Sequence, residues 1–153
     1  MIFKSQSERQ TMNFALNFSK NIQRGSTIAL IGSLGSGKTV FAKGFAKGLK
    51  IKENVGSPTF KIISEYIGIP HNLYHIDSYR LNGASDFLKI GGEEYLNQDK
   101  GVTIIEWADL IDDILPEKTI LITFERLDRE NDRQIKIKKT QNEKINISDR
   151  DFI

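Results

Sequence analysis

The sequence predicts an α/β fold, and two observations support this class. A short β-branched apolar run at residues 27–31 predicts a buried strand, which a glycine-rich loop at residues 32–39 follows directly. Apolar residues at helical spacing then continue to about Leu49 and predict a helix after the loop. Two more β-branched apolar runs, at residues 102–105 and 119–124, predict further buried strands. We therefore expect strands and helices to alternate around one sheet.

Length and composition limit the classes of protein to consider. The 153 residues suffice for a single domain (1–153), and 39% hydrophobic with 27% charged residues is typical of folded, water-soluble chains. A net charge of +2 is too small for nucleic-acid binding by bulk electrostatics, and the lack of cysteine excludes disulfides and thiolate metal sites. We expect a cytoplasmic protein without membrane contact, because the sequence shows neither a signal peptide nor a membrane-spanning apolar stretch.

The chain before the loop is expected to form one strand and one helix. Residues 2–4 predict a short edge strand. Ser5 followed three residues later by Glu8 fits a capping box, and the apolar stripe after it predicts a helix over about residues 6–22. At the other end of the chain, the polar residues from about 140 to 153 are expected to form a loose tail.

The loop at residues 32–39 matches the phosphate-binding pattern G-x-x-x-x-G-K-[ST]. Its glycines let backbone N–H groups converge on a polyphosphate, and the N-terminus of the following helix adds its free N–H groups and its dipole. The pattern places Lys38 at the β- and γ-phosphates and the Thr39 hydroxyl on Mg²⁺. The residues expected to contact the nucleotide are Ser33, Leu34, Gly35, Ser36, Gly37, Lys38, Thr39 and Val40.

Two glycines are embedded in the helix that follows the loop. Gly44 and Gly48 lie four residues apart, and each weakens a helix relative to alanine. Such a spacing suits close approach of another element to the helix. We expect these glycines to allow close packing against the sheet.

Residues 57–60 read Ser-Pro-Thr-Phe, and Pro58 favours an extended conformation at Ser57. The hydroxyls of Ser57 and Thr59 lie near the start of an element, where capping is their commoner role. Contact with phosphate or Mg²⁺ is the second interpretation, and the residue types leave both open.

A predicted hairpin brings further polar residues to the sheet. Residues 61–67 and 73–77 alternate as strands around a turn. His75 and Asp77 are two residues apart and share one face of the second strand. Asp77 is the best candidate for orienting water or supporting the metal, and Arg80 could offset γ-phosphate charge. A structural ion pair between Asp77 and Arg80 is the alternative.

A carboxylate follows the next buried strand. Helix formers predict two short helices at about residues 84–89 and 92–97, and the strand at 102–105 then ends in Glu106 and Trp107. An acid directly after a β-branched strand is typical of a Walker-B strand, which brings a carboxylate to the end of the sheet beside the loop. We expect Thr39 and Glu106 to hold Mg²⁺, Glu106 directly or through water.

The remaining elements complete the predicted sheet, and absent motifs exclude two classes. We expect a helix over residues 108–115 that Pro116 ends, and a half-buried strand at residues 133–139 near a sheet edge. The sequence lacks the N-K-x-D and D-x-x-G motifs of G-proteins. It also lacks an arginine-rich kinase lid, since four of its seven arginines lie at or beyond Arg126.

Five motifs in a fixed order carry a resemblance to a known family. They are G-S-L-G-S-G-K-T at 32–39, S-P-T-F at 57–60, H-I-D-S-Y-R-L at 75–81, G-G-E-E-Y-L at 91–96 and I-E-W at 105–107. In this order and spacing the sequence closely resembles the bacterial TsaE (YjeE) family, small ATPases of the tRNA threonylcarbamoyladenosine pathway. The chain departs mildly from the family at Ser33, where an acidic residue is common.

The resemblance implies a P-loop NTPase-like three-layer α/β/α sandwich. Its central sheet would be mixed and largely parallel, with antiparallel edge strands. It implies binding of ATP or ADP with Mg²⁺ and weak ATP hydrolysis. Lys38 and Thr39 match the family's P-loop pair, Glu106 its Mg²⁺-linked acid, Asp77 its required acid and Trp107 the tryptophan beside that acid. The catalytic residues expected on these grounds are Lys38, Asp77, Glu106 and Arg80.

The resemblance also implies partners. Members associate with the TsaD–TsaB pair, which transfers threonylcarbamoyl to the tRNA adenosine next to the anticodon, and ATP hydrolysis resets that complex. The chain would then meet tRNA only indirectly, through the complex. Two alternatives stay open: a nucleotide-dependent switch that controls assembly, and a small-molecule kinase.

Overall fold

The computed structural model describes residues 1–56 and 61–139. Its helices and strands follow one another in the order expected for an α/β protein. They are β1 (Ile2–Ser5), α1 (Glu8–Ser19), β2 (Thr27–Gly32), α2 (Lys38–Gly48), β3 (Ile63–Tyr66), β4 (Asn72–Asp77), α3 (Ala84–Lys89), α4 (Glu93–Leu96), β5 (Gly101–Glu106), the 3-10 helix η1 (Ala108–Ile114), β6 (Ile120–Arg126) and β7 (Arg133–Lys139).

The seven strands form one sheet in the order β1-β7-β6-β2-β5-β4-β3. The four central strands β6, β2, β5 and β4 run parallel to one another. The outer strands pair antiparallel, β7 with β6, β1 with β7, and β3 with β4. The structure therefore confirms the expected sheet, parallel at its centre with antiparallel edges.

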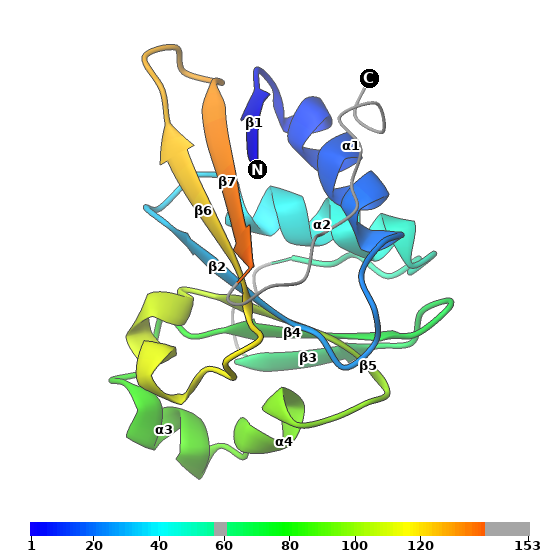
Figure 1. The fold of residues 1–153 in the computed structure, drawn as a ribbon, viewed down its shortest axis with the longest axis vertical. Coiled ribbons are helices and arrows are strands. Elements are labelled where there is room, and N and C mark those ends of the chain that lie inside the picture. The colour runs from blue at the N-terminus through cyan, green and yellow to red at the C-terminus, as the bar shows by residue number, and fades with distance from the viewer. Residues whose placement is uncertain (57–60, 140–153) are drawn as a thin grey trace.

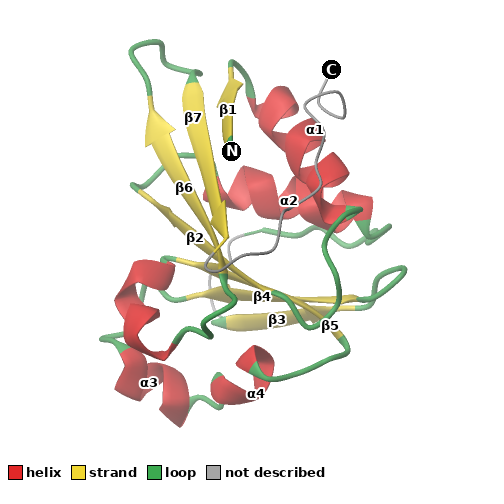
Figure 2. Cartoon of the chain, in the orientation of Figure 1, coloured by secondary structure: helices red, strands yellow, loops and turns green. Residues whose placement is uncertain are grey.

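Helices cover both faces of this sheet, which confirms the three-layer α/β/α architecture (Figures 1 and 2). Helices α1 and α2 lie on one face, and α3, α4 and η1 lie on the other. Alternate residues of each buried strand contribute to the two apolar clusters: Ile104 packs on the α1–α2 side and Ile105 on the α3–η1 side. None of the helices in residues 1–56 and 61–139 combines the length and apolar character that a membrane span needs.

The start of α1 differs from the prediction. Ser7, not Ser5, is the N-cap: its hydroxyl accepts a hydrogen bond from the backbone N–H of Gln10 at 3.1 Å. Ser5 cannot take this role because it is the last residue of β1, paired in register with Arg133. Its buried hydroxyl donates to the carbonyl of Ser7 instead. The helix is also shorter than the expected range of about 6–22.

The two glycines of α2 pack against α1, so the expectation that they pack against the sheet is wrong. A Cβ atom built on Gly44 would lie 2.3 Å from the Met12 carbonyl oxygen. One built on Gly48 would lie 1.8 Å from the Ser19 hydroxyl oxygen. The two positions therefore bring the helix backbones together, and α2 meets the sheet through larger apolar residues such as Phe41 and Phe45.

The other predicted elements fall mostly where expected. The hairpin is confirmed, with β3 and β4 paired antiparallel, although β3 is shorter than residues 61–67. The helix predicted over 108–115 is a 3-10 helix that ends before Pro116. The Ser-Pro-Thr-Phe segment at 57–60 and the tail from about 140 to 153 lie outside the described residues.

Candidate functional site

The site lies where the parallel strands end. Gly32 ends β2, Asp77 ends β4 and Glu106 ends β5, and Asp77 and Glu106 are direct partners in the sheet register. The phosphate-binding loop connects the end of β2 to the start of α2. The carboxyl ends of parallel strands lie at the same edge of the sheet, so residues far apart in the sequence come together here.

The loop has the backbone geometry that its glycines permit. Gly37 caps α2 with φ of 110°, a left-handed conformation that a side chain would strain. Gly32 is closely packed: a Cβ there would lie 2.6 Å from the Ser36 hydroxyl oxygen and 2.8 Å from the Phe124 carbonyl oxygen. The two fixed glycines of the loop are therefore required for different reasons: Gly32 has no room for a side chain, and Gly37 has a backbone conformation that a side chain would strain.

Lys38 points back over the loop. Its Nζ donates to the carbonyl of Gly32 at 2.5 Å and to that of Ser33 at 2.9 Å, and it lies 4.0 Å from the centroid of the Trp107 ring. The residue is 4% exposed. Burial lowers the pKa of the Lys38 ammonium, and the nearby carboxylates, Glu106 foremost, oppose this shift. An anion placed beside Lys38 would find a charge that water screens weakly.

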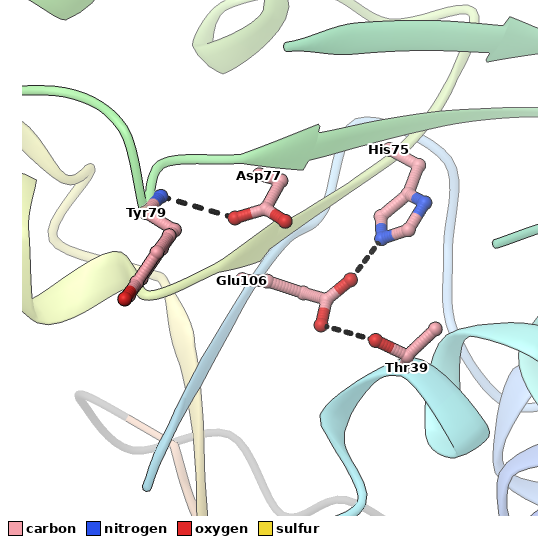
Figure 3. A network of polar contacts seen from close by, with 5 residues as sticks. All are labelled: Thr39, His75, Asp77, Tyr79 and Glu106. Atoms are coloured by element: carbon pink, nitrogen blue, oxygen red, sulfur yellow. Dashed lines mark hydrogen bonds and ion pairs between the residues drawn. The ribbon is translucent and has the colours of Figure 1, made fainter. Parts of the chain in front are cut away.

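Glu106 links α2 to β4 through both of its carboxylate oxygens (Figure 3). Thr39 Oγ1 donates to Glu106 Oε1 at 2.8 Å, and His75 Nε2 lies 2.6 Å from Glu106 Oε2. Glu106 is 2% exposed and His75 is fully buried. The register of β4 and β5 places His75 two pairs deeper in the sheet than Asp77, on the same face as Glu106.

The donor atoms at this point suit Mg²⁺. Thr39 and Glu106 supply hard oxygens, the ligand type that Mg²⁺ prefers. Among the described residues no group of three or more His, Cys, Asp or Glu side chains could hold a metal ion by itself. Proteins commonly bind Mg²⁺ through one or two side chains together with water and substrate phosphates. Thr39 and Glu106 would therefore hold the ion only next to a bound polyphosphate.

The residues of the H-x-D-x-Y-R motif differ in their burial and in their contacts at the site. Asp77 is half-buried at the end of β4, and its Oδ1 accepts a hydrogen bond from the Tyr79 backbone N–H at 3.0 Å (Figure 3). The Tyr79 ring lies 4.9 Å from the Trp107 ring. Trp107 itself has a left-handed backbone, with φ of 57°. Arg80 is exposed in the turn after β4.

A cleft of about 270 Å³ opens beside the loop. Of the eight predicted contact residues, all but Ser33 line it, and Glu106 and Trp107 border it as well. The cleft also has walls that the sequence did not predict. They are Ser7, Glu8 and Thr11 at the start of α1, and Asn131 and Arg133 near the start of β7.

Arg133 is the charged residue among these additional walls that touches the loop. Its Nη2 donates to the Gly35 carbonyl at 3.2 Å, and its Nη1 donates to the carbonyls of Glu130 and Asp132. Sequence reasoning placed this residue only in an edge strand. The alternation of residues 133–139 predicts a strand, but it does not reveal that β7 lies beside β6 and starts near the loop.

Comparisons with known proteins identify a matching family, similar relatives and a similar solved structure. A family model described as threonylcarbamoyl adenosine biosynthesis protein TsaE matches residues 5–135. A tRNA threonylcarbamoyladenosine biosynthesis protein TsaE from Treponema pallidum is 38% identical over 133 residues, 87% of this chain and 96% of that protein. Its namesake from Bacillus subtilis is 46% identical over 102 residues, 67% of this chain and 63% of that protein. The crystal structure of Bacillus subtilis YdiB has a TM-score of 0.79 at 33% identity, covering 92% of this chain and 86% of that one.

Proposed function

The chain belongs to the TsaE family, and on this premise we propose that it binds ATP or ADP with Mg²⁺ and hydrolyses ATP weakly. Hydrolysis would support the TsaD–TsaB complex in the threonylcarbamoyl modification of the tRNA adenosine next to the anticodon. In this proposal the protein acts in the cytoplasm and contacts tRNA only indirectly, through the complex. The observation that carries it is the direct contact of Thr39 with Glu106 beside the buried Lys38.

The residues around the loop would bind and hold the polyphosphate. The loop N–H groups and the N-terminus of α2 donate to phosphate oxygens, and Lys38 exchanges its contacts with the Gly32 and Ser33 carbonyls for contacts with the β- and γ-phosphates. Bound Mg²⁺ supplies charge neutralisation on the phosphates. Because Lys38 is already desolvated, little reorganisation accompanies this exchange.

Asp77 would orient the attacking water. It ends the strand next to Glu106 and is half-buried, and one of its oxygens holds the Tyr79 N–H. An oriented water in line with the bond that breaks, between the γ-phosphorus and the bridging oxygen, is what hydrolysis requires. Arg80 reaches the γ-phosphate in this proposal only if its exposed side chain folds back, so we assign it the smallest role.

The test is the ATPase rate with and without purified TsaD–TsaB. We expect the pair to stimulate the wild-type rate. Lys38→Met should lower the stimulated rate by about 100-fold, the usual order for loss of one preorganised charge stabiliser. Glu53→Gln serves as the control, because Glu53 is exposed and does not border the cleft. Absence of both stimulation and binding would contradict the partner claim.

Glu106→Ala separates hydrolysis from a nucleotide-dependent switch. The variant should abolish hydrolysis while the loop still binds ADP, since the loop amides and Lys38 remain. If tRNA modification stops, turnover is required. If modification continues with hydrolysis abolished and nucleotide binding intact, the protein is a switch rather than an energy source.

A further inference from the structure

His75 is a buried imidazole that the proposed mechanism does not use. It lies inside β4, pairs with Ile104 in the sheet and is fully buried. Leu73 and Ile76, which lie in the same strand, are apolar and equally buried. A purely packing role at this position would suit an aliphatic side chain better, because burying an imidazole removes two polar nitrogens from water.

Only one nitrogen of His75 has a hydrogen-bond partner among the described residues, and that partner is Glu106. Its Nε2 lies 2.6 Å from Glu106 Oε2, whereas its Nδ1 is buried and has no hydrogen-bond partner among the described residues. One nitrogen is thus left without a partner while the other makes a short contact with a carboxylate. We read the contact with Glu106 as the reason for a histidine here, since nothing else in the described structure uses the ring.

The contact fixes the orientation of the Glu106 carboxylate. A glutamate at a strand end has three rotatable side-chain bonds, and one hydrogen bond from Thr39 leaves the carboxylate free to turn about it. The second contact, from His75 on the other oxygen, removes that freedom. Because Glu106 accepts the Thr39 hydroxyl proton, the lone pairs of Thr39 Oγ1 stay available to a cation.

We propose that His75 is a positioning residue: through the hydrogen bond from Nε2 it holds Glu106 so that Glu106 and Thr39 present their oxygens together to a divalent cation beside the nucleotide. The inference rests on the proposed function, because the cation binds there with a polyphosphate. It assigns a role to a residue that touches neither nucleotide nor metal. Partners of this kind typically change metal affinity by 10–100-fold when they are removed.

Two variants with side chains of similar length test the role of the Nε2–H donor. Gln places an amide N–H near the position of His75 Nε2, and Met has the same length without a donor. We expect His75→Met to weaken Mn²⁺ binding to the ADP complex by roughly 10–100-fold, as measured by electron paramagnetic resonance of free Mn²⁺. His75→Gln should restore most of the affinity. ADP binding without metal should be unchanged in both variants.

His71 provides a matched control. It is the other histidine of the chain, is also buried, and contacts the Ile22 carbonyl away from the cleft. His71→Met should lower the melting temperature without changing Mn²⁺ affinity. If His75→Met binds Mn²⁺–ADP as tightly as the wild type, or if His75→Gln and His75→Met lose the same affinity, the positioning role is refuted.

An imidazole NMR measurement on the wild type keeps the proposal testable if His75→Met does not fold. With two histidines in the chain, the ring nitrogens can be assigned individually. We expect a slowly exchanging proton on His75 Nε2, in the free protein and with Mg²⁺–ADP. An unprotonated Nε2 in the complex would overturn the inference. Failure of the wild type to bind ADP at all would instead refute the proposed function, and the NMR signal of the free protein would still report on the contact.

Discussion

The two faces of the sheet are held together by different means. On the α1–α2 face, aromatic rings pack in a continuous cluster: the rings of Phe14, Phe18, Phe41 and Phe45 form successive pairs with centroids 5.8–6.3 Å apart. On the other face, Phe87 is the one phenylalanine of the apolar cluster in the described residues. The helices there are short, and they leave Leu88, Ile90 and Leu110 partly exposed.

This difference matters because the candidate site belongs to the well-packed face. The loop continues into α2, and α2 is held by α1 through backbone contacts at Gly44 and Gly48. Lys38 and Thr39 start the same helix. A site that needs fixed distances between α2 and the strand ends therefore stands on the layer with the more extensive aromatic packing. The three predictions below test this contrast, starting with the largest expected effect.

The first prediction compares two fully buried phenylalanines, one on each face. Phe18→Ala should lower the free energy of unfolding by about 4 kcal/mol, because the ring cluster around it cannot collapse into the cavity. Phe87→Ala should cost less, about 3 kcal/mol, since the short helix α3 can shift to fill part of the space. Urea unfolding of both variants measures the two values.

The affinity for ADP is a second measurement that distinguishes Phe18→Ala from Phe87→Ala. Phe87 packs on the face opposite the loop, so Phe87→Ala should bind ADP like the wild type under native conditions. Phe18→Ala should bind ADP more weakly, because α1 borders the cleft and supports α2. Equal losses of stability and of ADP affinity in the two variants would show that the faces do not differ as described.

The second prediction concerns the contact between α1 and α2. Gly44→Ala should destabilise the protein by about 2 kcal/mol, because the new methyl group meets the backbone of Met12 and the helices must separate. This cost outweighs the better helix propensity of alanine, about 1 kcal/mol. Thermal unfolding measures the change. Gly56→Ala is the control, since a Cβ there meets no atom of the described residues within 4 Å, and a stability gain in Gly44→Ala would contradict the close approach.

Much of the fold follows from local patterns, because buried parallel strands and a glycine-rich loop have distinctive sequences. The order of strands does not, since it depends on which strands pair across the whole chain. For that reason Glu106 was expected beside the loop on the strength of its strand, whereas Arg133 was not. The loop contact of Arg133 exists because β7 follows β6 back along the sheet.

The smaller errors of the sequence-based prediction also have identifiable structural causes. The spacing of Ser5 and Glu8 predicted Ser5 as the helix cap, but Ser5 pairs in β1, and Ser7 is the cap instead. Gly44 and Gly48 signal close packing, but one sequence cannot say which element approaches. His75 was placed on the face of Asp77 by alternation. Its contact with Glu106 depends on the register of β4 and β5, which only the folded sheet defines.

The third and smallest prediction concerns how α4 is attached to the edge of the sheet. Tyr95 of α4 donates a hydrogen bond to the carboxylate of Glu65 in β3, and this bond raises the pKa of the Tyr95 hydroxyl from 10.0 to about 12. The stabilising contribution of the bond is complete below pH 10 and is lost as the pH rises through about 12, because the folded state holds the proton longer than the unfolded state does. Tyr95→Phe should cost about 0.5 kcal/mol at neutral pH, which suits a single bond near the surface. The ultraviolet difference between wild type and variant isolates the ionisation of Tyr95 during a pH titration. A midpoint near 10 would show that the hydrogen bond from Tyr95 to Glu65 does not attach α4 to β3.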